Sequence, residues 1–279
     1  MTDLRQPLAP RQQTPAAGGP PELELSGVSV CFGGVNAVSQ VSFSVTRGSI
    51  HALIGPNGAG KSSCFNAITG VYRLAEGRVA HRGERIDQLR AARIARRGIA
   101  RTFQNLVLPE SLTVAECMRV ARHHRTHAGF LATGLGLPRA RREERSDRAV
   151  IERSAELAGV ADILDERVGP LPYGVRKRVE FARALCAEPS VLMLDEPVAG
   201  INDTESAQMA HAVRRARDEA GLTVLLVEHD MNFVMTLADR ITVLQSGQVI
   251  ADAAPEEVRA DPAVIAAYLG DDVEEAARD

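Results

Sequence analysis

The chain has 279 residues, enough for one large domain or two modest ones, and its 45% apolar and 25% charged residues are typical of soluble globular proteins. Its 33 Lys and Arg nearly balance its 36 Asp and Glu, for a net charge of −3. This balance argues against a protein whose main role is to coat nucleic acid, and no apolar stretch approaches the roughly 18–20 residues that span a bilayer.

Residues 1–22 are rich in Pro, Gly, Gln and Ala, without hydrophobic periodicity or the apolar core of a secretory signal. We therefore expect a disordered leader. The four cysteines stand far apart and form no C-x-x-C pair, so we expect reduced thiols rather than a metal or disulfide framework. They are Cys31, Cys64, Cys117 and Cys186.

From Leu23 the chain alternates apolar and polar residues, first to Phe32 and again over 41–45, and 78–81 is a further short strand candidate. This pattern predicts a small antiparallel layer with one solvated face. Short, continuous apolar runs separated by helical patterns predict a second sheet, of buried parallel strands with crossover helices. These runs are 50–54, 191–194, 223–227 and 241–244.

The segment from about 111 to 170 has no such apolar run and is helical in pattern, with a Gly-rich break at 129–138. It predicts a helical subdomain inserted into the α/β core, at about 105–187. Its Arg-rich part, 139–148, has two interpretations. It contacts anionic lipid headgroups or a loop of a partner protein, or it is a solvated helix face paired with Glu143, Glu144 and Asp147.

Gly55–Ser62 matches the pattern G-x-x-x-x-G-K-S, directly after the strand at 50–54 and before a helical pattern at 61–69. Such a loop points backbone N–H groups at phosphate oxygens, and the helix N-terminus adds a positive dipole end. Lys61 would neutralise the β- and γ-phosphates and Ser62 would bind Mg²⁺. The nucleotide-binding residues predicted here are Gly55, Pro56, Asn57, Gly58, Ala59, Gly60, Lys61, Ser62 and Ser63.

Asp195 and Glu196 end the apolar run at 191–194, at the edge where α/β sheets bind ligands. Asp195 is predicted to hold Mg²⁺, and Glu196 to polarise the attacking water. Two acids at a strand end can also cap the next helix. The assignment to catalysis therefore depends on the phosphate loop in the same chain.

With these motifs, residues 23–270 resemble the ATP-binding subunits of ABC transporters, leaving an acidic tail at 271–279. The resemblance implies an α/β P-loop NTPase fold, with a mostly parallel core sheet, a small antiparallel β layer and the inserted helical subdomain. It also implies an ATPase that uses ATP and Mg²⁺ to drive transmembrane transport.

Four further positions are similar to family motifs and follow in the family's order. By resemblance, Phe32 stacks on adenine, Gln104 contacts Mg²⁺ and couples to the membrane subunit, and His229 contacts the γ-phosphate. Tyr173 and Gly174 belong to the signature that binds the nucleotide of a second subunit. The catalytic residues predicted are Glu196, His229 and Gln104, and the predicted Mg²⁺ ligands are Ser62, Gln104 and Asp195.

The chain departs from the family pattern at two positions. Pro172 stands where the signature usually has Ser, and it offers neither a hydroxyl nor a backbone N–H to the γ-phosphate. We expect a weaker but working contact, and a heterodimer with a partner that carries a fuller signature is a second hypothesis. Asn202 stands where the loop after the acids usually has Asp.

The run 98–105, the insert and the segment 263–270 resemble the branched-chain (hydrophobic) amino acid uptake branch. That resemblance implies transmembrane permeases, a second ATP-binding subunit in a homo- or heterodimer, and a periplasmic or extracellular solute-binding protein, without nucleic acid. It implies a peripheral location at the cytoplasmic face of the inner membrane.

Three alternatives stay open: an exporter, a non-transport ABC machine, and a regulatory nucleotide-binding module that does not hydrolyse ATP. A single phosphate loop without heptads or metal spacings disfavours the non-transport machines. The presence of Lys61, Asp195, Glu196 and His229 favours hydrolysis.

Overall fold

The computed structural model describes residues 21–102, 108–122 and 138–268, with the backbone alone over 138–143. Gln104, the acidic tail and all but the last two residues of the expected leader lie outside the described residues. Their predicted roles stay predictions.

A six-stranded sheet forms the centre, in the order β10-β9-β3-β8-β7-β6. All neighbouring pairs are parallel except β9 and β10, which form an antiparallel hairpin. The four apolar runs are all strands of this sheet, as predicted. The strands are β3 (Ile50–Ile54), β6 (Ile99–Arg101), β7 (Val191–Asp195), β8 (Thr223–Val227), β9 (Arg240–Gln245) and β10 (Gln248–Ala253).

Alternation along the buried strands divides the interior into two cores. In β7, Leu192 and Leu194 join the core that includes most of the helices, while Val191 and Met193 join the core shared with α1 and the second sheet. Because successive side chains of a strand point to opposite faces, a continuous apolar run is what a sheet covered on both sides requires.

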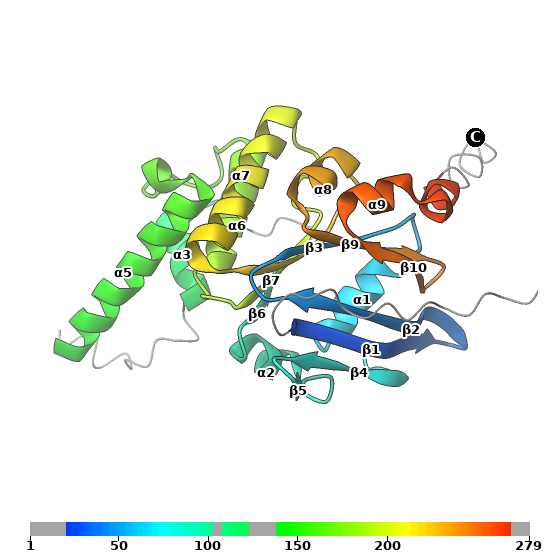
Figure 1. Cartoon of the computed structure of the whole chain (residues 1–279). Helices are drawn as coiled ribbons and strands as arrows, with labels where there is room; N and C mark the ends of the chain where they lie inside the picture. The colour runs from blue at the N-terminus through cyan, green and yellow to red at the C-terminus, as the bar shows by residue number, and fades with distance from the viewer. Residues whose placement is uncertain (1–20, 103–107, 123–137, 269–279) are drawn as a thin grey trace, which may run out of the picture.

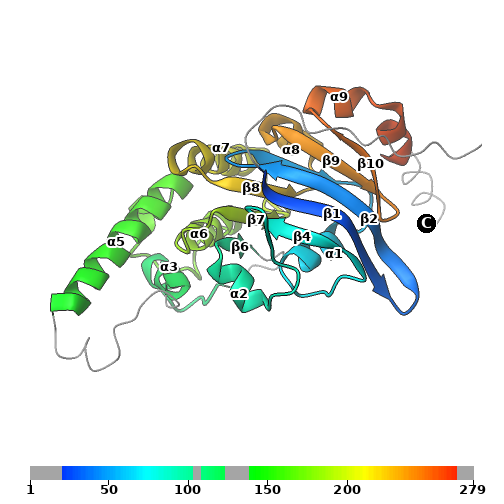
Figure 2. The same ribbon diagram turned by 60° about the horizontal axis from the view of Figure 1, so that its bottom comes forward.

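The second sheet is antiparallel, in the order β2-β1-β4-β5, and lies across α1 (Lys61–Ile68) from the central sheet (Figures 1 and 2). Its first strand begins at Pro21, not at Leu23, because Glu22 is buried and accepts a 2.7 Å hydrogen bond from Arg82. The strands are β1 (Pro21–Phe32), β2 (Val35–Thr46), β4 (Glu76–His81) and β5 (Glu84–Arg85).

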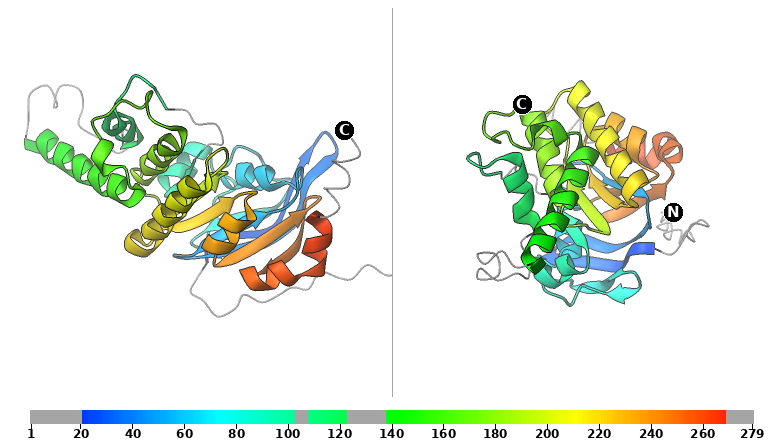
Figure 3. Two further views of the ribbon diagram at one scale, coloured as in Figure 1. Left: turned by 90° about the horizontal axis from the view of Figure 1, so that it is seen from above. Right: turned by 90° about the vertical axis from the view of Figure 1, so that its left-hand side faces the viewer.

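Helices α6, α7 and α8 contribute to the core on the other face of the central sheet, while α2 lies beside β6 and α9 beside β9 and β10. Helices α3 and α5, with a short 3₁₀ turn η1, lie at the end of the molecule away from the second sheet and pack on α6 (Figures 1 and 3). The bounds are α2 (Ala91–Arg96), α3 (Val114–Arg122), α5 (Pro138–Ala158), η1 (Ala161–Ile163), α6 (Tyr173–Leu185), α7 (Asp203–Ala220), α8 (Met231–Leu237) and α9 (Pro255–Ala260).

A buried arginine joins the helices at that end. Arg122 of α3 pairs with Asp147 of α5 at 2.5 Å and with Glu188 at 3.0 Å. The sequence predicted that Asp147 pairs with arginines of its own helix, but its partner here is Arg122 of α3. Arg148, in the Arg-rich segment, pairs with Glu152 one helical turn away. Among the described residues no helix combines the length and the hydropathy needed to cross a bilayer.

Candidate functional site

Three consecutive strands bring the predicted motifs to one edge of the central sheet. The phosphate loop follows β3 and His229 lies just after β8. Asp195 ends β7 and Glu196 follows it, and β8 lies between the other two strands. Neighbouring strands are about 4.8 Å apart, so β3 and β7 are separated by roughly 10 Å. The glycine-rich loop and the acids are thus close neighbours at the carboxyl edge, where open α/β sheets bind ligands.

The phosphate loop has a shape that requires glycine at both ends. Gly55 has φ +149°, and a Cβ there would lie 2.1 Å from the Leu244 carbonyl oxygen. Gly60 has φ +100°, and a Cβ there would lie 2.5 Å from the Ala37 carbonyl oxygen. No side chain in the described part of the chain caps α1, which begins at Lys61 within the loop motif. Its first N–H groups therefore remain suited to an anion.

The predicted lysine lies against this loop. The buried Lys61 ammonium donates to the carbonyl oxygens of Gly55 at 2.6 Å and Pro56 at 2.8 Å. Asn57 and Gly58 at the loop tip are exposed, Pro56 and Ala59 are buried, Ser62 is exposed and Ser63 is half-buried. The structure thus gathers the predicted residues 55–63 around one loop and helix start.

Asp195 is 5% exposed and has a partner that the sequence did not reveal. Arg101, at the end of β6, donates from Nη2 to Asp195 Oδ2 at 2.6 Å and from Nη1 to Asn66 Oδ1 of α1 at 2.6 Å. The backbone N–H of Asp195 also donates to the Thr102 hydroxyl at 3.3 Å. Arg101 therefore connects the acid to the helix that follows the phosphate loop.

Glu196 and His229 are in direct contact, with Glu196 Oε1 and His229 Nε2 3.1 Å apart. Glu196 has φ +48°, a left-handed conformation that non-glycine residues seldom adopt, and such strain concentrates at functional sites. Its backbone N–H donates to the Val227 carbonyl at 2.9 Å, which ties the end of β7 to the end of β8.

A second acid beside this pair, Glu228, was also missed. It accepts from the backbone N–H groups of Val198 at 2.8 Å and His229 at 2.9 Å, so it joins the loops that follow β7 and β8. Burial raises the pKa of Glu228 above its usual value, although these hydrogen bonds act against the shift. Its position next to His229 in sequence was the available signal.

The signature residues lie at the start of α6. Pro172 precedes the helix without a side-chain cap among the described residues, Tyr173 is 45% exposed and Gly174 is buried. The Tyr173 ring packs against the loop that follows the two acids. A Cβ added to Gly200 in that loop would lie only 3.4 Å from the ring.

Asn202 has a local role in that loop. Its side chain caps α7 by accepting from the Glu205 N–H at 3.0 Å, and Glu205 bonds back to the Asn202 N–H. The sequence left open that Asp195 and Glu196 cap the next helix. The structure excludes this, because the cap of α7 is Asn202.

Phe32, the predicted adenine platform, is 46% exposed at the end of β1. The Tyr72 ring meets it edge to face, with centroids 4.8 Å apart. Tyr72 in turn donates its backbone N–H to the carbonyl of Asn66 on α1 at 3.1 Å. Tyr72 was not predicted from the sequence, and it brings the ring of Phe32 into contact with a segment that is bonded to the helix of the phosphate loop.

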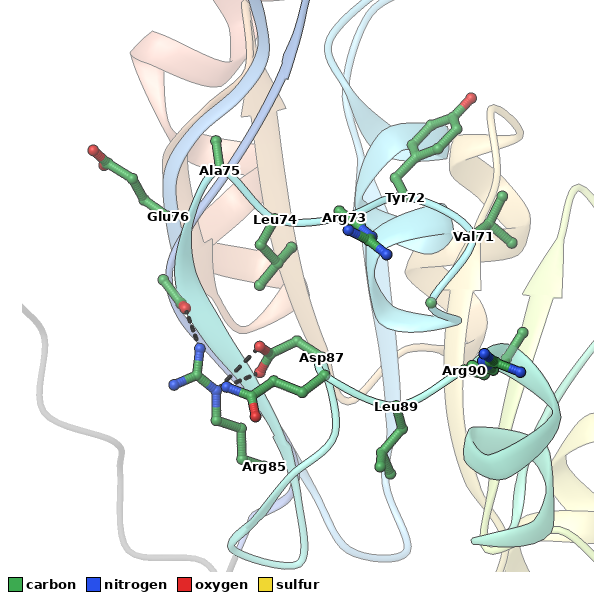
Figure 4. Close-up of a pocket in the computed structure, with 14 residues that line it drawn as sticks. Val71, Tyr72, Arg73, Leu74, Ala75, Glu76, Arg85, Asp87, Leu89 and Arg90 are labelled. Carbon is green, nitrogen blue, oxygen red and sulfur yellow. Dashed lines mark hydrogen bonds and ion pairs between the residues drawn. The ribbon is translucent and has the colours of Figure 1, made fainter.

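A pocket of about 570 Å³ lies beyond Tyr72, between the loop 70–75 and the segment from β5 to α2 (Figure 4). Arg85 lies at one end of this pocket, where it donates to Asp87 and to the Gly77 carbonyl. None of the predicted site residues that the structure describes lines this pocket, so they all lie outside it.

The oxygen donors at this edge fit Mg²⁺. Ser62 offers a hydroxyl and Asp195 a carboxylate, the hard ligands that Mg²⁺ prefers, and Mg²⁺ commonly takes one or two protein ligands while phosphates and waters complete its shell. The described residues contain no cluster of three or more His, Cys, Asp or Glu that would hold a metal without a nucleotide.

Comparison with known proteins agrees with this geometry. The family model described as ABC transporter matches residues 38–199, and the one described as branched-chain amino acid ATP-binding cassette transporter matches residues 248–274.

Curated relatives match along nearly their whole length. The branched-chain amino acid transport ATP-binding protein BraF of Pseudomonas aeruginosa is 40% identical over 251 residues, covering 90% of this chain and 98% of BraF. LivG of Escherichia coli, described in the same terms, is 37% identical over 254 residues, with the same coverage. An ABC transporter cassette solved in its ADP conformation superposes with a TM-score of 0.78 at 29% identity, covering 90% of this chain and all of that one.

Proposed function

Because the chain belongs to the ABC transporter family of ATP-binding cassettes, we propose that it energises the uptake of branched-chain amino acids or a related small solute. The family is one of ATP-binding ATPases, and its P-loop NTPase fold is the one found here. The cargo is inferred from relatives named for branched-chain amino acid transport, and from the family model of branched-chain amino acid ATP-binding cassettes that matches residues 248–274 of this chain.

The contact between Glu196 and His229 is the observation that supports hydrolysis most directly. A carboxylate 3.1 Å from an imidazole, beside a phosphate loop, can accept a proton from an attacking water while the imidazole orients that carboxylate and the γ-phosphate. Lys61 and the N–H groups at the start of α1 supply the positive charge that the phosphates require. This arrangement favours an ATPase over a regulatory module that only binds nucleotide.

Mg²⁺, held by Ser62 and Asp195, would neutralise phosphate charge in the bound state. The chain's own residues do the rest. Arg101 keeps Asp195 at the sheet edge through their 2.6 Å ion pair, and Phe32, backed by Tyr72, offers a face for adenine.

The exposed signature residues support a second subunit as a partner. The start of α6, with Tyr173 exposed, would face the nucleotide held by the second copy or by a related subunit. ATP between the two would close the pair and its hydrolysis would let it open, which gives the nucleotide the differential affinity needed to drive a change. Transmembrane permeases and a solute-binding protein would then complete an importer, with this chain on the cytoplasmic face.

A phosphate-release assay on the purified protein tests the enzymatic part. We expect hydrolysis by the wild type, loss of at least about a hundredfold in Glu196→Gln, and no change in Glu257→Gln, an exposed acid on α9. Retained hydrolysis in Glu196→Gln would contradict the role given to Glu196.

Reconstitution tests the transport part. The protein should co-purify with membrane permeases and, in vesicles that contain them, should drive ATP-dependent uptake of labelled leucine or a related solute. Hydrolysis without any permease partner, or solute movement in the opposite direction, would favour a non-transport machine or an exporter instead.

A further inference from the structure

The sequence contains only two lysines among its 33 Lys and Arg residues, and both lie at the catalytic edge. Lys61 is the lysine of the phosphate loop. The second, Lys177, stands in the second turn of α6 and is 3% exposed. In a chain that otherwise uses arginine for positive charge, a buried lysine requires an explanation, because burying an ammonium is costly unless it is well paired.

Two contacts stabilise this ammonium. Lys177 Nζ donates to the carbonyl oxygen of Glu196 at 3.0 Å, and it lies 5.7 Å from the centre of the Tyr173 ring, within the range of a cation–π interaction. Tyr173 is the exposed residue at the start of the signature helix. Lys177 thus stands between the signature and the peptide that carries the proposed general base.

The backbone of Glu196 is held by hydrogen bonds on both sides. Its left-handed backbone, φ +48°, is unfavourable for a non-glycine residue and persists only where the surroundings fix it. One side of the residue is fixed by its N–H, which donates to Val227. On the other side, its carbonyl oxygen accepts from the Ala199 N–H at 3.2 Å and from Lys177 Nζ at 3.0 Å, and the Glu196 side chain reaches His229 at 3.1 Å.

We propose that Lys177 is a positioning residue, which holds the Glu196 peptide in its left-handed conformation and so aims the carboxylate at the reacting water. The inference rests on the proposed function of Glu196 as the base. It also gives the signature a second task. The start of α6 serves the nucleotide of the partner, while four residues later the same helix supports the base of its own subunit. Tyr173, Lys177, Glu196 and His229 form one chain of contacts between the two sites.

Kinetics of Lys177→Met test this inference, since methionine keeps the length and apolar stem but removes the donor. We expect kcat to fall by about tenfold or more while KM for ATP changes by less than about twofold, because a misplaced base slows the chemistry without altering the phosphate loop. Arg183→Met removes a cation from the last turn of the same helix and should leave both parameters unchanged.

The same substitution in a Glu196→Gln background separates positioning from general damage. Residual single-turnover hydrolysis of Glu196→Gln should not fall further when Lys177→Met is added, because the group that Lys177 positions has already lost its function. An equal fold loss in both backgrounds, or a rise in KM that accompanies the fall in kcat, would overturn the proposal. If Glu196→Gln hydrolyses ATP at the wild-type rate, the proposed function of Glu196 is wrong. If Glu196→Gln is impaired but Lys177→Met keeps the wild-type kcat, only the role given to Lys177 is wrong.

A spectroscopic test avoids reliance on a variant that folds poorly. Protein carrying isotope-labelled lysine gives two side-chain NMR signals, assigned by Lys177→Arg. When ATP and Mg²⁺ close the Glu196→Gln dimer, both signals should shift, Lys61 through the phosphates and Lys177 through Tyr173. A Lys177 signal that stays unchanged in the nucleotide-bound dimer would contradict the link between the two sites.

Discussion

The carboxylate of Glu205 lies directly over Gly174: a Cβ on Gly174 would be 2.3 Å from Glu205 Cδ. Glu205 is held there by the capping box with Asn202 at the start of α7. A side chain at the signature glycine would therefore displace Glu205 within its own subunit, in addition to affecting any contact with a partner's nucleotide.

Gly174→Ala should push Glu205 out of the capping box. The loss of one cap would lower the free energy of unfolding by about 1 kcal/mol, and the displaced helix start should weaken ATP-driven dimerisation. Urea unfolding and light scattering measure the two effects. Because Glu205→Ala already removes the clash, the double variant should be no less stable than Glu205→Ala alone. Additive losses of stability would show that the overlap of these two residues is not the cause.

Arg101→Met should destabilise the nucleotide-free protein. It removes the partner of Asp195, an acid that is only 5% exposed, and breaking such a buried pair costs about 3 kcal/mol. Urea unfolding with and without Mg-ATP measures the loss and whether ligand offsets it. Asp195→Asn in the Arg101→Met background provides the control, because it removes the uncompensated charge and should recover part of the stability. Wild-type stability in Arg101→Met would contradict the role given to this ion pair.

What the sequence predicted correctly depends on local pattern. The conformation of the phosphate loop is determined by its own glycines and by the strand and helix beside it, so its place could be predicted. The strands with continuous apolar runs could be predicted too. Strand β6 has three residues, too few for a pattern. The contact of Lys177 with Glu196 joins residues 19 positions apart, and that of Arg101 with Asp195 joins residues 94 positions apart. Both depend on how α6 and β6 pack beside β7, which no local pattern contains.

Asn202 was open to a better prediction. It was compared with the aspartate that the family usually has at that place. Asn202 with Glu205 three positions later, however, has the spacing of a capping box, and the structure forms that box. The sequence alone could have indicated the local role.

Thiol reactivity should distinguish one cysteine from the other three. Burial raises the pKa of Cys64 to about 12 and that of Cys186 to about 11, and it also raises the pKa of Cys117, whereas Cys31 is exposed. In the native protein a thiol reagent should label only Cys31, so Cys31→Ser should not be labelled. In the denatured wild type all four thiols should react. Cys31 precedes Phe32, so ATP should slow its labelling if adenine stacks there. Rapid labelling of several native thiols would contradict the predicted burial.

Acid should destabilise the fold through His51. Burial lowers the pKa of His51 from 6.5 to about 4; Asp252 opposes the shift and Arg240 adds to it. The unfolded chain therefore binds a proton at His51 more readily than the folded chain does. The contribution of the neutral, buried imidazole to the free energy of unfolding is complete above pH 6.5. It is lost as the pH falls towards 4, by about 3 kcal/mol in all. The difference in unfolding free energy between the wild type and His51→Gln, measured across this range, isolates the effect. A difference that does not vary with pH would contradict it.

Pro172→Ser should strengthen the contact between subunits. Pro172 has φ −53° at the cap of α6, where a serine hydroxyl can accept from the first turn and donate to a phosphate. The gained cap, about 1 kcal/mol, offsets the similar loss from a more flexible unfolded chain, so stability should change little. Dimer affinity in the Glu196→Gln background should rise with ATP present. Pro172→Ala supplies the control, because it removes the proline ring without adding a hydroxyl. If the Ser and Ala variants dimerise alike, position 172 does not reach the nucleotide.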